Sequence, residues 1–165
     1  MVTLYNVISE DGYIAERGGT ENFIPDSVWS DFLNLCQQND VVIMGRKTYE
    51  AIQQYPATLI KEFENLKLKK VVVTRNSNYK IKASYIITNG LKVALVLGNN
   101  VLISSGPDLN TGAVAEEIID KVILNIIPSK VLDGIKQFNV EPELKMIFEK
   151  KFEDGRIWRE YQVVK

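Results

Sequence analysis

The chain has 165 residues, 45% of them hydrophobic and 25% charged, and 20 basic against 21 acidic residues leave a net charge of −1. This length fits a single domain over residues 1–165, and the balanced charge gives no electrostatic basis for binding nucleic acid or an anionic membrane. The absence of histidine excludes Ser-His-Asp and Cys-His nucleophiles and histidine metal sites, and the single cysteine, Cys36, excludes an intrachain disulfide, so we expect no metal.

The N-terminal quarter predicts a strand, a turn, a loop and a helix. Residues 2–8 are rich in β-forming side chains, residues 9–12 (SEDG) are a turn signal, and residues 13–15 form a short apolar return. The adjacent glycines Gly18 and Gly19 predict a flexible loop, which either covers a site or only connects elements. A helix then begins near Asp26 and Ser27, either of which could cap its free backbone N–H groups.

Residues 41–50 (VVIMGRKTYE) predict a buried strand, a tight turn at Gly45 and a helix start. The free N–H groups at a helix start attract anions, Arg46 offers a planar fork suited to phosphate, and Lys47 adds a mobile charge. We interpret this turn as a phosphate cradle, although an ordinary strand-to-helix turn with solvated charges accounts for the same residues. A P-loop is excluded, because Arg46 and Val41 occupy positions where that motif requires glycine.

Two later segments repeat the pattern of a strand followed by a polar turn. Residues 70–74 predict a strand that leads into Arg75, and residues 100–104 predict a strand that leads into Gly106 and Pro107, a good start signal for a helix reaching residue 119. Ligands of open α/β sheets bind at the carboxyl ends of strands, so these turns could serve one ligand. The intervening segments predict a helix over residues 57–66 and a strand over residues 84–88. Residues 90–97 suit either a helix or a strand, and the alternation of strands and helices around them favours a helix.

The C-terminal part predicts a central strand and a closing hairpin. Residues 121–127 are strongly apolar except for Asn125, which must find a partner in a neighbouring loop or a ligand. Residues 128–140 are expected to be irregular. Residues 143–152 and 156–164 alternate around an Asp-Gly pair, which is a strong hairpin signal.

Three of these segments, in order, resemble parts of a known superfamily. Residues 41–52 (VVIMGRKTYEAI) are similar to the cofactor-binding segment of dihydrofolate reductases. Residues 9–15 (SEDGYIA) resemble the S-x-D-G-x-I-A start of the riboflavin-pathway reductase domain, the RibD C-terminal domain, and residues 105–110 (SGPDLN) resemble its G-G-P-x-L-N turn. With the closing hairpin, the resemblance covers nearly the whole chain.

The resemblance implies an α/β fold in three layers, with a mostly parallel central sheet and an antiparallel C-terminal hairpin, and it implies NADPH as hydride donor. The implied cofactor-binding residues are Ile14, Ala15, Gly45, Arg46, Lys47, Thr48, Thr74, Arg75, Asn76, Ser104, Ser105, Gly106, Pro107, Asp108 and Leu109. On the substrate side, the implied residues are Asp26 as catalytic carboxylate, with Asp31 as a second candidate, and Ser27, Trp29, Phe32, Tyr49 and Asn125 as contacts. Arginine at two of the turns suits NADPH over NADH, because a 2′-phosphate favours a bidentate cation.

The chain departs from both families on the substrate side. Riboflavin-pathway enzymes carry Lys and Glu where this chain has Tyr13 and Ser104, and Ser105 replaces the first glycine of their turn. The spacing from Asp26 to Gly45 is longer than in dihydrofolate reductases. We expect an NADPH-dependent reductase of a small heterocycle, of the 5-amino-6-(5-phosphoribosylamino)uracil reductase type. The alternatives are a dihydrofolate reductase, a non-catalytic NADPH-binding module and a structural domain.

Two further expectations concern location and assembly. No apolar run reaches the length of a membrane span and the N-terminus lacks a signal-peptide pattern, so a cytoplasmic protein is expected. The resemblance to the riboflavin-pathway group, together with apolar residues on the closing strands, predicts a homodimer.

Overall fold

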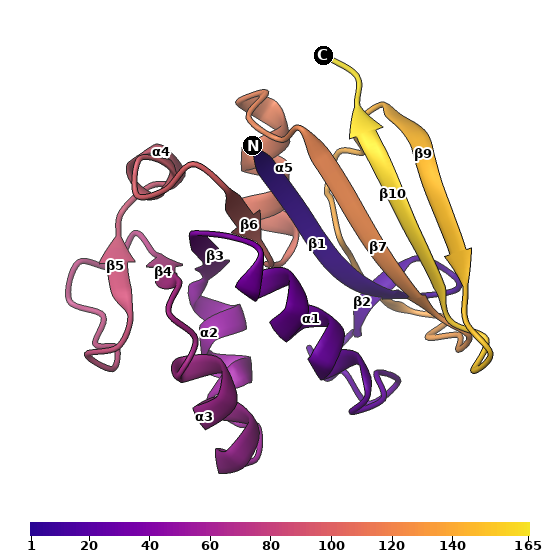
Figure 1. Ribbon diagram of the computed structural model, residues 1–165, viewed down its shortest axis with the longest axis horizontal. Helices are drawn as coiled ribbons and strands as arrows, with labels where there is room; N and C mark the ends of the chain where they lie inside the picture. The colour runs from indigo at the N-terminus through magenta and orange to yellow at the C-terminus, as the bar shows by residue number, and fades with distance from the viewer.

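The computed structural model describes residues 1–165 and places an eight-stranded sheet between two layers of helices (Figure 1). The strands of this sheet are β1 (Val2–Ser9), β3 (Val41–Gly45), β4 (Lys69–Val73), β5 (Ile86–Thr88), β6 (Val101–Ile103), β7 (Lys121–Ile127), β9 (Leu144–Lys151) and β10 (Ile157–Val163). They lie in the order β5-β4-β3-β6-β1-β7-β10-β9. All neighbours from β5 to β7 run parallel, whereas β10 is antiparallel to both β7 and β9. The predicted α/β fold class is therefore confirmed.

The helices cover the two faces of the sheet and build a core on each. One core combines α1 (Val28–Gln37), α2 (Arg46–Ile52) and α3 (Ala57–Glu64) with the sheet, and Phe32 and Phe63 lie in it. The other core contains residues of α4 (Leu91–Leu95) and α5 (Pro107–Ala115). Strands β3, β6 and β7 are apolar along nearly their whole length because both of their faces are buried, as is usual for parallel strands. No helix is both long and apolar enough to cross a bilayer.

The sheet order brings the three predicted turns to one edge. Strands β4, β3 and β6 are consecutive and parallel, so the turns that follow them lie side by side. Gly45, the last residue of β3, pairs in register with Val73, the last residue of β4. The segments at residues 45–48, 74–76 and 104–106 therefore converge where ligands of parallel sheets usually bind.

A small second sheet was only partly foreseen. Strand β2 (Tyr13–Glu16) does not return along β1 but pairs with β8 (Gly134–Lys136), inside the segment that was expected to be irregular. Gly134 permits this close approach, because an added Cβ would lie 2.3 Å from the Ala15 carbonyl oxygen. A strand of three residues is too short to produce a recognisable hydrophobic period.

Helix α1 begins where the sequence predicts, but its predicted side-chain cap is absent, and the predicted end of α5 is wrong. Neither Asp26 nor Ser27 caps α1 with its side chain, because Ser27 itself has helical dihedral angles and the backbone N–H groups of Val28 and Trp29 donate to carbonyls of the preceding turn. Helix α5 ends at Ala115 rather than near residue 119. Glu117 adopts a φ of 54°, and such a left-handed residue terminates a helix.

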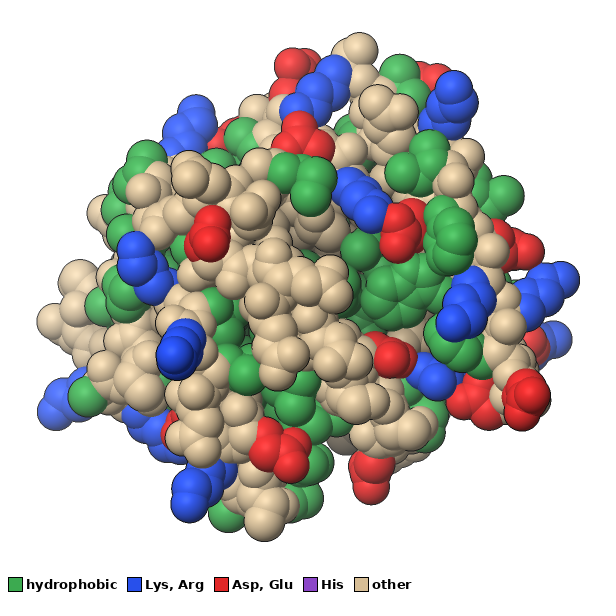
Figure 2. Space-filling model, in the orientation of Figure 1, with side chains coloured by type: hydrophobic (Ala, Val, Ile, Leu, Met, Phe, Trp, Pro, Cys, Tyr) green, Lys and Arg blue, Asp and Glu red, His purple; other side chains and the backbone are tan.

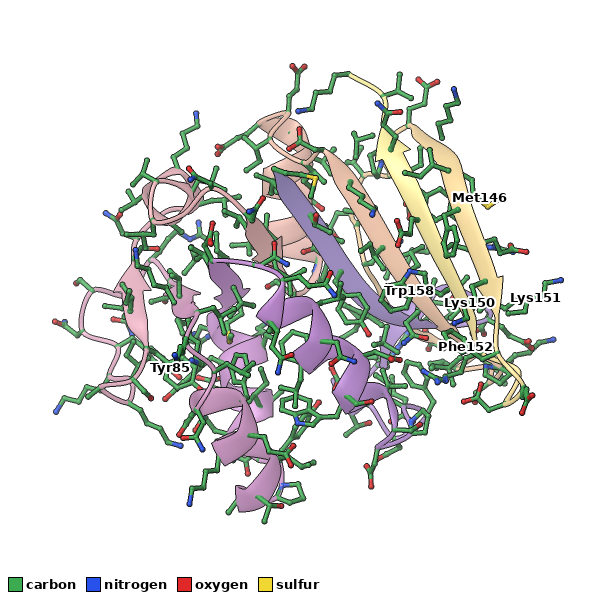
Figure 3. The ribbon with its side chains drawn as sticks, in the orientation of Figure 1. Tyr85, Met146, Lys150, Lys151, Phe152 and Trp158 are labelled. Atoms are coloured by element: carbon green, nitrogen blue, oxygen red, sulfur yellow. The ribbon has the colours of Figure 1, made fainter.

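The C-terminal hairpin leaves apolar side chains on the surface. Figure 2 shows hydrophobic side chains exposed over the region of β7, β10 and β9. On the outer strand β9, Met146 and Phe148 are about half exposed, and Figure 3 shows Met146 at this outer edge, far from Tyr85 at the opposite side of the molecule. Trp158 of β10 instead packs against Tyr5, with ring centroids 5.9 Å apart.

Candidate functional site

A cleft of about 490 Å³ opens beside β1, under the loop of residues 16–27 and next to the turns after β3 and β6. Its wall is built by β1, Ile14 of β2, this loop, α1, α2, the start of α3 and the turn after β6. The predicted site residues that line it are Ile14, Asp26, Trp29, Phe32, Thr48, Ser104, Ser105 and Gly106. The cleft thus joins residues that were assigned to the cofactor with residues that were assigned to the substrate.

The other predicted cofactor residues lie beside the wall rather than in it. Gly45, Arg46 and Lys47 immediately precede Thr48 in the same turn, and residues 74–76 form the turn after the neighbouring strand β4. Pro107, Asp108 and Leu109 form the first turn of α5, directly after Gly106. Ala15 is buried next to Ile14, and Ser27 is exposed at the start of α1.

The turns after β3 and β6 are joined by Ser105. The backbone N–H of Gly45 donates to Ser105 Oγ at 2.9 Å, and a Cβ added to Gly45 would lie only 3.0 Å from that oxygen. The Ser105 carbonyl in turn accepts hydrogen bonds from the side-chain amides of Asn6 at 2.9 Å and Asn110 at 3.1 Å. Asn110, which the sequence marked only as part of a motif, is fully buried and also donates to the Gln137 carbonyl. This network fixes the shape of both turns.

Arg46 is oriented by two neighbours. Its Nη1 atom donates to Glu50 Oε1 at 2.9 Å, and its guanidinium carbon lies 5.7 Å from the ring centroid of Tyr79. The Tyr79 hydroxyl donates to the same Glu50 oxygen at 2.8 Å. Lys47 and Arg75 are exposed on the same edge of the sheet. This edge therefore carries three cations beside the N-terminal ends of α2 and α5, which is a donor set suited to phosphate groups.

Two predicted substrate contacts lie behind the cleft wall. Tyr49 is buried in the core, where its ring packs edge-on against Tyr85 and its hydroxyl accepts the Lys82 backbone N–H at 3.2 Å. Asn125 has no exposed surface, and its side-chain amide donates to Asp31 Oδ2 at 2.9 Å and lies 3.4 Å from the Tyr5 hydroxyl. Of the two alternatives left open for Asn125, the structure shows contact with a neighbouring element.

Asp31 belongs to an ion pair that sequence reasoning missed. Its carboxylate accepts a hydrogen bond from Nη1 of Arg156 at 2.5 Å. The side chain of Asp31 is only 22% exposed and that of Arg156 only 12%. Arg156 also binds Asp154 at 2.6 Å, so the turn of the C-terminal hairpin is tied to α1. This engagement leaves Asp26, which is exposed and lines the cleft, as the predicted carboxylate that a ligand can reach.

A second carboxylate in the cleft was not predicted. Glu21 lines the wall and accepts a hydrogen bond from the Tyr55 hydroxyl at 2.9 Å. Burial raises the pKa of Glu21, and the bond from Tyr55 opposes that shift only in part. Burial likewise raises the pKa of Tyr55. No sequence pattern marks this pair, because a loop and the connection between α2 and α3 meet only in the folded chain.

The Asp-Gly motif after β1 has a structural role. The Asp11 carboxylate accepts the Ser9 hydroxyl at 2.6 Å and the backbone N–H groups of Val131 and Leu132. These bonds, that from Ser9 above all, lower the pKa of Asp11 to about 2. Asp11 thus joins the turn after β1 to the segment that precedes β8, next to Ile14 and Ala15.

Comparisons with known proteins agree with this architecture. The model of the RibD C-terminal domain family matches residues 1–134. An uncharacterized protein of Bacillus subtilis (strain 168), YwjB, is 28% identical over 147 residues, with 82% of this chain and 81% of the relative covered.

Two solved structures share the fold over 99% of this chain. A putative riboflavin biosynthesis protein from Shewanella sp. PV-4 has a TM-score of 0.76 at 18% identity, with 99% of that chain covered. A diaminohydroxyphosphoribosylaminopyrimidine deaminase/5-amino-6-(5-phosphoribosylamino)uracil reductase from Thermotoga maritima has a TM-score of 0.73 at 15% identity, with 56% of that longer chain covered. At these identities the likeness shows the fold.

Proposed function

Because the chain belongs to the RibD C-terminal domain family, we propose that it is an NADPH-dependent reductase of a small heterocyclic substrate. The observation that carries this proposal is the meeting of three strand-end turns with an aromatic cleft. The turns after β4, β3 and β6 lie side by side, and the last of them forms part of the cleft wall. A ligand lying across the turns would extend into the cleft.

The donor set of the turns fits NADPH. Arg46, Lys47 and Arg75 offer cations to its phosphates, and Arg46 and Arg75 offer the forks that suit the 2′-phosphate. The absence of a Cβ at Gly45 lets Ser105 Oγ approach the backbone closely, and the hydrogen bond between them fixes the turn. Bound NADPH would supply a hydride, and the protein would supply orientation and exclude water. Ile14 and Gly106, both in the wall, would face the nicotinamide end.

The cleft fits a flat substrate. Trp29 lies against Phe32 and Tyr55 with ring centroids 5.3 Å apart in both cases, and all three side chains line the wall. Aromatic walls of this kind stack on heterocycles. We propose a substrate of the ribosylamino-pyrimidine type, as in 5-amino-6-(5-phosphoribosylamino)uracil reduction, with hydride accepted by a carbonyl or imine carbon.

Reduction of such a carbon also requires a proton. Two carboxyl groups, Asp26 and Glu21, line the cleft. Asp26 remains the candidate that the sequence proposed. Glu21 is the stronger candidate for the donor, because burial raises its pKa and only a protonated carboxyl group can donate. After transfer, the Tyr55 hydroxyl would stabilise the resulting carboxylate through the bond it already donates.

The test is to supply NADPH with 5-amino-6-(5-phosphoribosylamino)uracil, its dephosphorylated nucleoside or dihydrofolate, and to follow loss of the reduced nicotinamide. Turnover of either pyrimidine supports the proposal. Turnover of dihydrofolate alone would favour the dihydrofolate reductase alternative. The position of Asp26 in the cleft wall supports that alternative. Tight NADPH binding without any turnover would indicate a non-catalytic NADPH-binding module. Absence of NADPH binding would refute the pyrimidine reductase, the dihydrofolate reductase and the binding module alike.

A further inference from the structure

The cleft carries negative charge and no positive side chain. Its wall contains the carboxyl groups of Glu21 and Asp26, several aromatic rings and two asparagines, but no Lys or Arg. The two carboxylates come from the same loop, and Glu21 is partly buried. Any ligand group deep in this cleft is therefore surrounded by aromatic rings and carboxyl groups, with no cation among them.

Three arginines near the cleft are engaged elsewhere. Arg17 is the only cation in the loop of residues 16–27, and it points outward, where it is 81% exposed and pairs with Asp133 at 2.8 Å. Arg156 pairs with Asp31 and Asp154. Arg46 and Lys47 lie outside the wall and belong, in the proposed function, to the cofactor. The N-terminal turn of α5 at Gly106 is likewise assigned to the cofactor.

A phosphate group would be disfavoured in such a place. A phosphate monoester carries a charge near −2 at neutral pH and is normally recognised by Arg, Lys or free backbone N–H groups. Placing it beside the Asp26 carboxylate and the Glu21 carboxyl group, with no cation in the wall, adds like-charge repulsion from Asp26 to the loss of its hydration. An uncharged ring meets neither penalty. Its N–H groups can donate to the carboxylates while its faces pack on Trp29 and Phe32.

We propose that the substrate of this cleft is a flat, uncharged heterocycle that carries no phosphate group, such as a dephosphorylated ribosylamino-pyrimidine. The inference rests on the proposed reductase function and adds the charge class of its substrate. It distinguishes this chain from a reductase that selects a phosphorylated sugar.

The experiment compares 5-amino-6-(5-phosphoribosylamino)uracil with its dephosphorylated nucleoside, at saturating NADPH, in the full chain. The expected result is a kcat/KM at least about tenfold higher for the nucleoside, since like-charge juxtaposition is costly. Equal values, or a preference for the phosphorylated compound, would overturn the inference. In parallel, binding of both compounds is measured by quenching of tryptophan fluorescence, because Trp29 lines the cleft.

The binding measurement separates the two proposals. If neither compound is turned over but the nucleoside binds more tightly, the reductase assignment for this substrate fails while the charge inference stands. If the phosphorylated compound binds as well as the nucleoside, or neither binds, the charge inference fails.

A variant pair tests the cause of the preference. Asn22 lines the cleft and is exposed, with its side-chain amide bound only to Glu16 at 3.2 Å. Asn22→Lys adds a cation to the wall and should reduce the preference for the nucleoside by about 3- to 10-fold. The matched control, Asn22→Gln, should leave the preference unchanged. A preference that is the same in both variants would show that charge does not set it.

Discussion

Replacement of Arg46 by alanine probes the phosphate cradle directly. The guanidinium is held by Glu50 at 2.9 Å and lies over the Tyr79 ring, so it is oriented before any ligand arrives. A charge-assisted hydrogen bond contributes about 1.5–3 kcal/mol, so the Kd for NADPH should rise about 10- to 150-fold in Arg46→Ala. The free energy of unfolding without cofactor should change by less than about 1 kcal/mol, because the ion pair with Glu50 is well exposed.

The assay is calorimetric titration of NADPH into each variant. Arg46→Lys should give an intermediate Kd, because it keeps the charge but loses the planar fork. Arg159→Ala serves as the matched control, since Arg159 lies on β10 and pairs with Glu149, away from the strand-end turns. If Arg46→Ala binds NADPH as tightly as the parent chain, the guanidinium does not hold a phosphate and the cradle argument is refuted.

Four further predictions follow from particular contacts. Ser105→Ala leaves the backbone N–H of Gly45 without its acceptor and should lower the free energy of unfolding by about 1–3 kcal/mol in urea titrations. An unchanged urea midpoint would show that the hydrogen bond between Gly45 and Ser105 does not stabilise the fold. Arg156→Met leaves the carboxylate of Asp31 without its cation and should lower the free energy of unfolding by about 2–3 kcal/mol. Adding Asp31→Asn should restore part of this loss, and absence of that recovery would contradict an ion-pair origin. The reduction rate should fall as pH rises through the raised pKa of Glu21, because only its acid form donates a proton. Glu21→Gln should be slow, and its rate should not show this fall with pH. A fall that persists in the variant would exclude Glu21 as the proton donor. We also propose that a second copy docks on the edge strand β9, so Phe148→Lys should lower the sedimentation coefficient, whereas a parent chain that sediments as a monomer would argue against the dimer.

Much of the fold could be predicted because its determinants are local in the sequence. The Val-Ile runs of β3 and β7 indicated buried strands, and the Asp-Gly pair near residue 154 indicated the closing hairpin. The turns after β3, β4 and β6 could be placed on one edge because parallel strands share their carboxyl ends. Boundaries that depend on single dihedral angles, such as that of Glu117, could not be foreseen.

The substrate side was harder to predict because its contacts join distant segments. Tyr55 and Glu21 are 34 residues apart, and Arg156 and Asp31 are 125 residues apart, and no periodicity relates such pairs. Tyr49 follows the cofactor turn closely in sequence, yet its position on α2 directs it into the core rather than the cleft. Sequence spacing thus located the strand-end turns but not the other residues that form the wall of the cleft.

The central claim is tested most directly by titrating NADPH and NADH separately into the unmodified protein. The account predicts one NADPH bound per chain, with an affinity for NADH that is weaker by about tenfold or more, because only NADPH carries the 2′-phosphate that the arginines of the strand-end turns would hold. Equal affinity for the two nucleotides would contradict the role of these arginines, and failure to bind either would contradict the account as a whole.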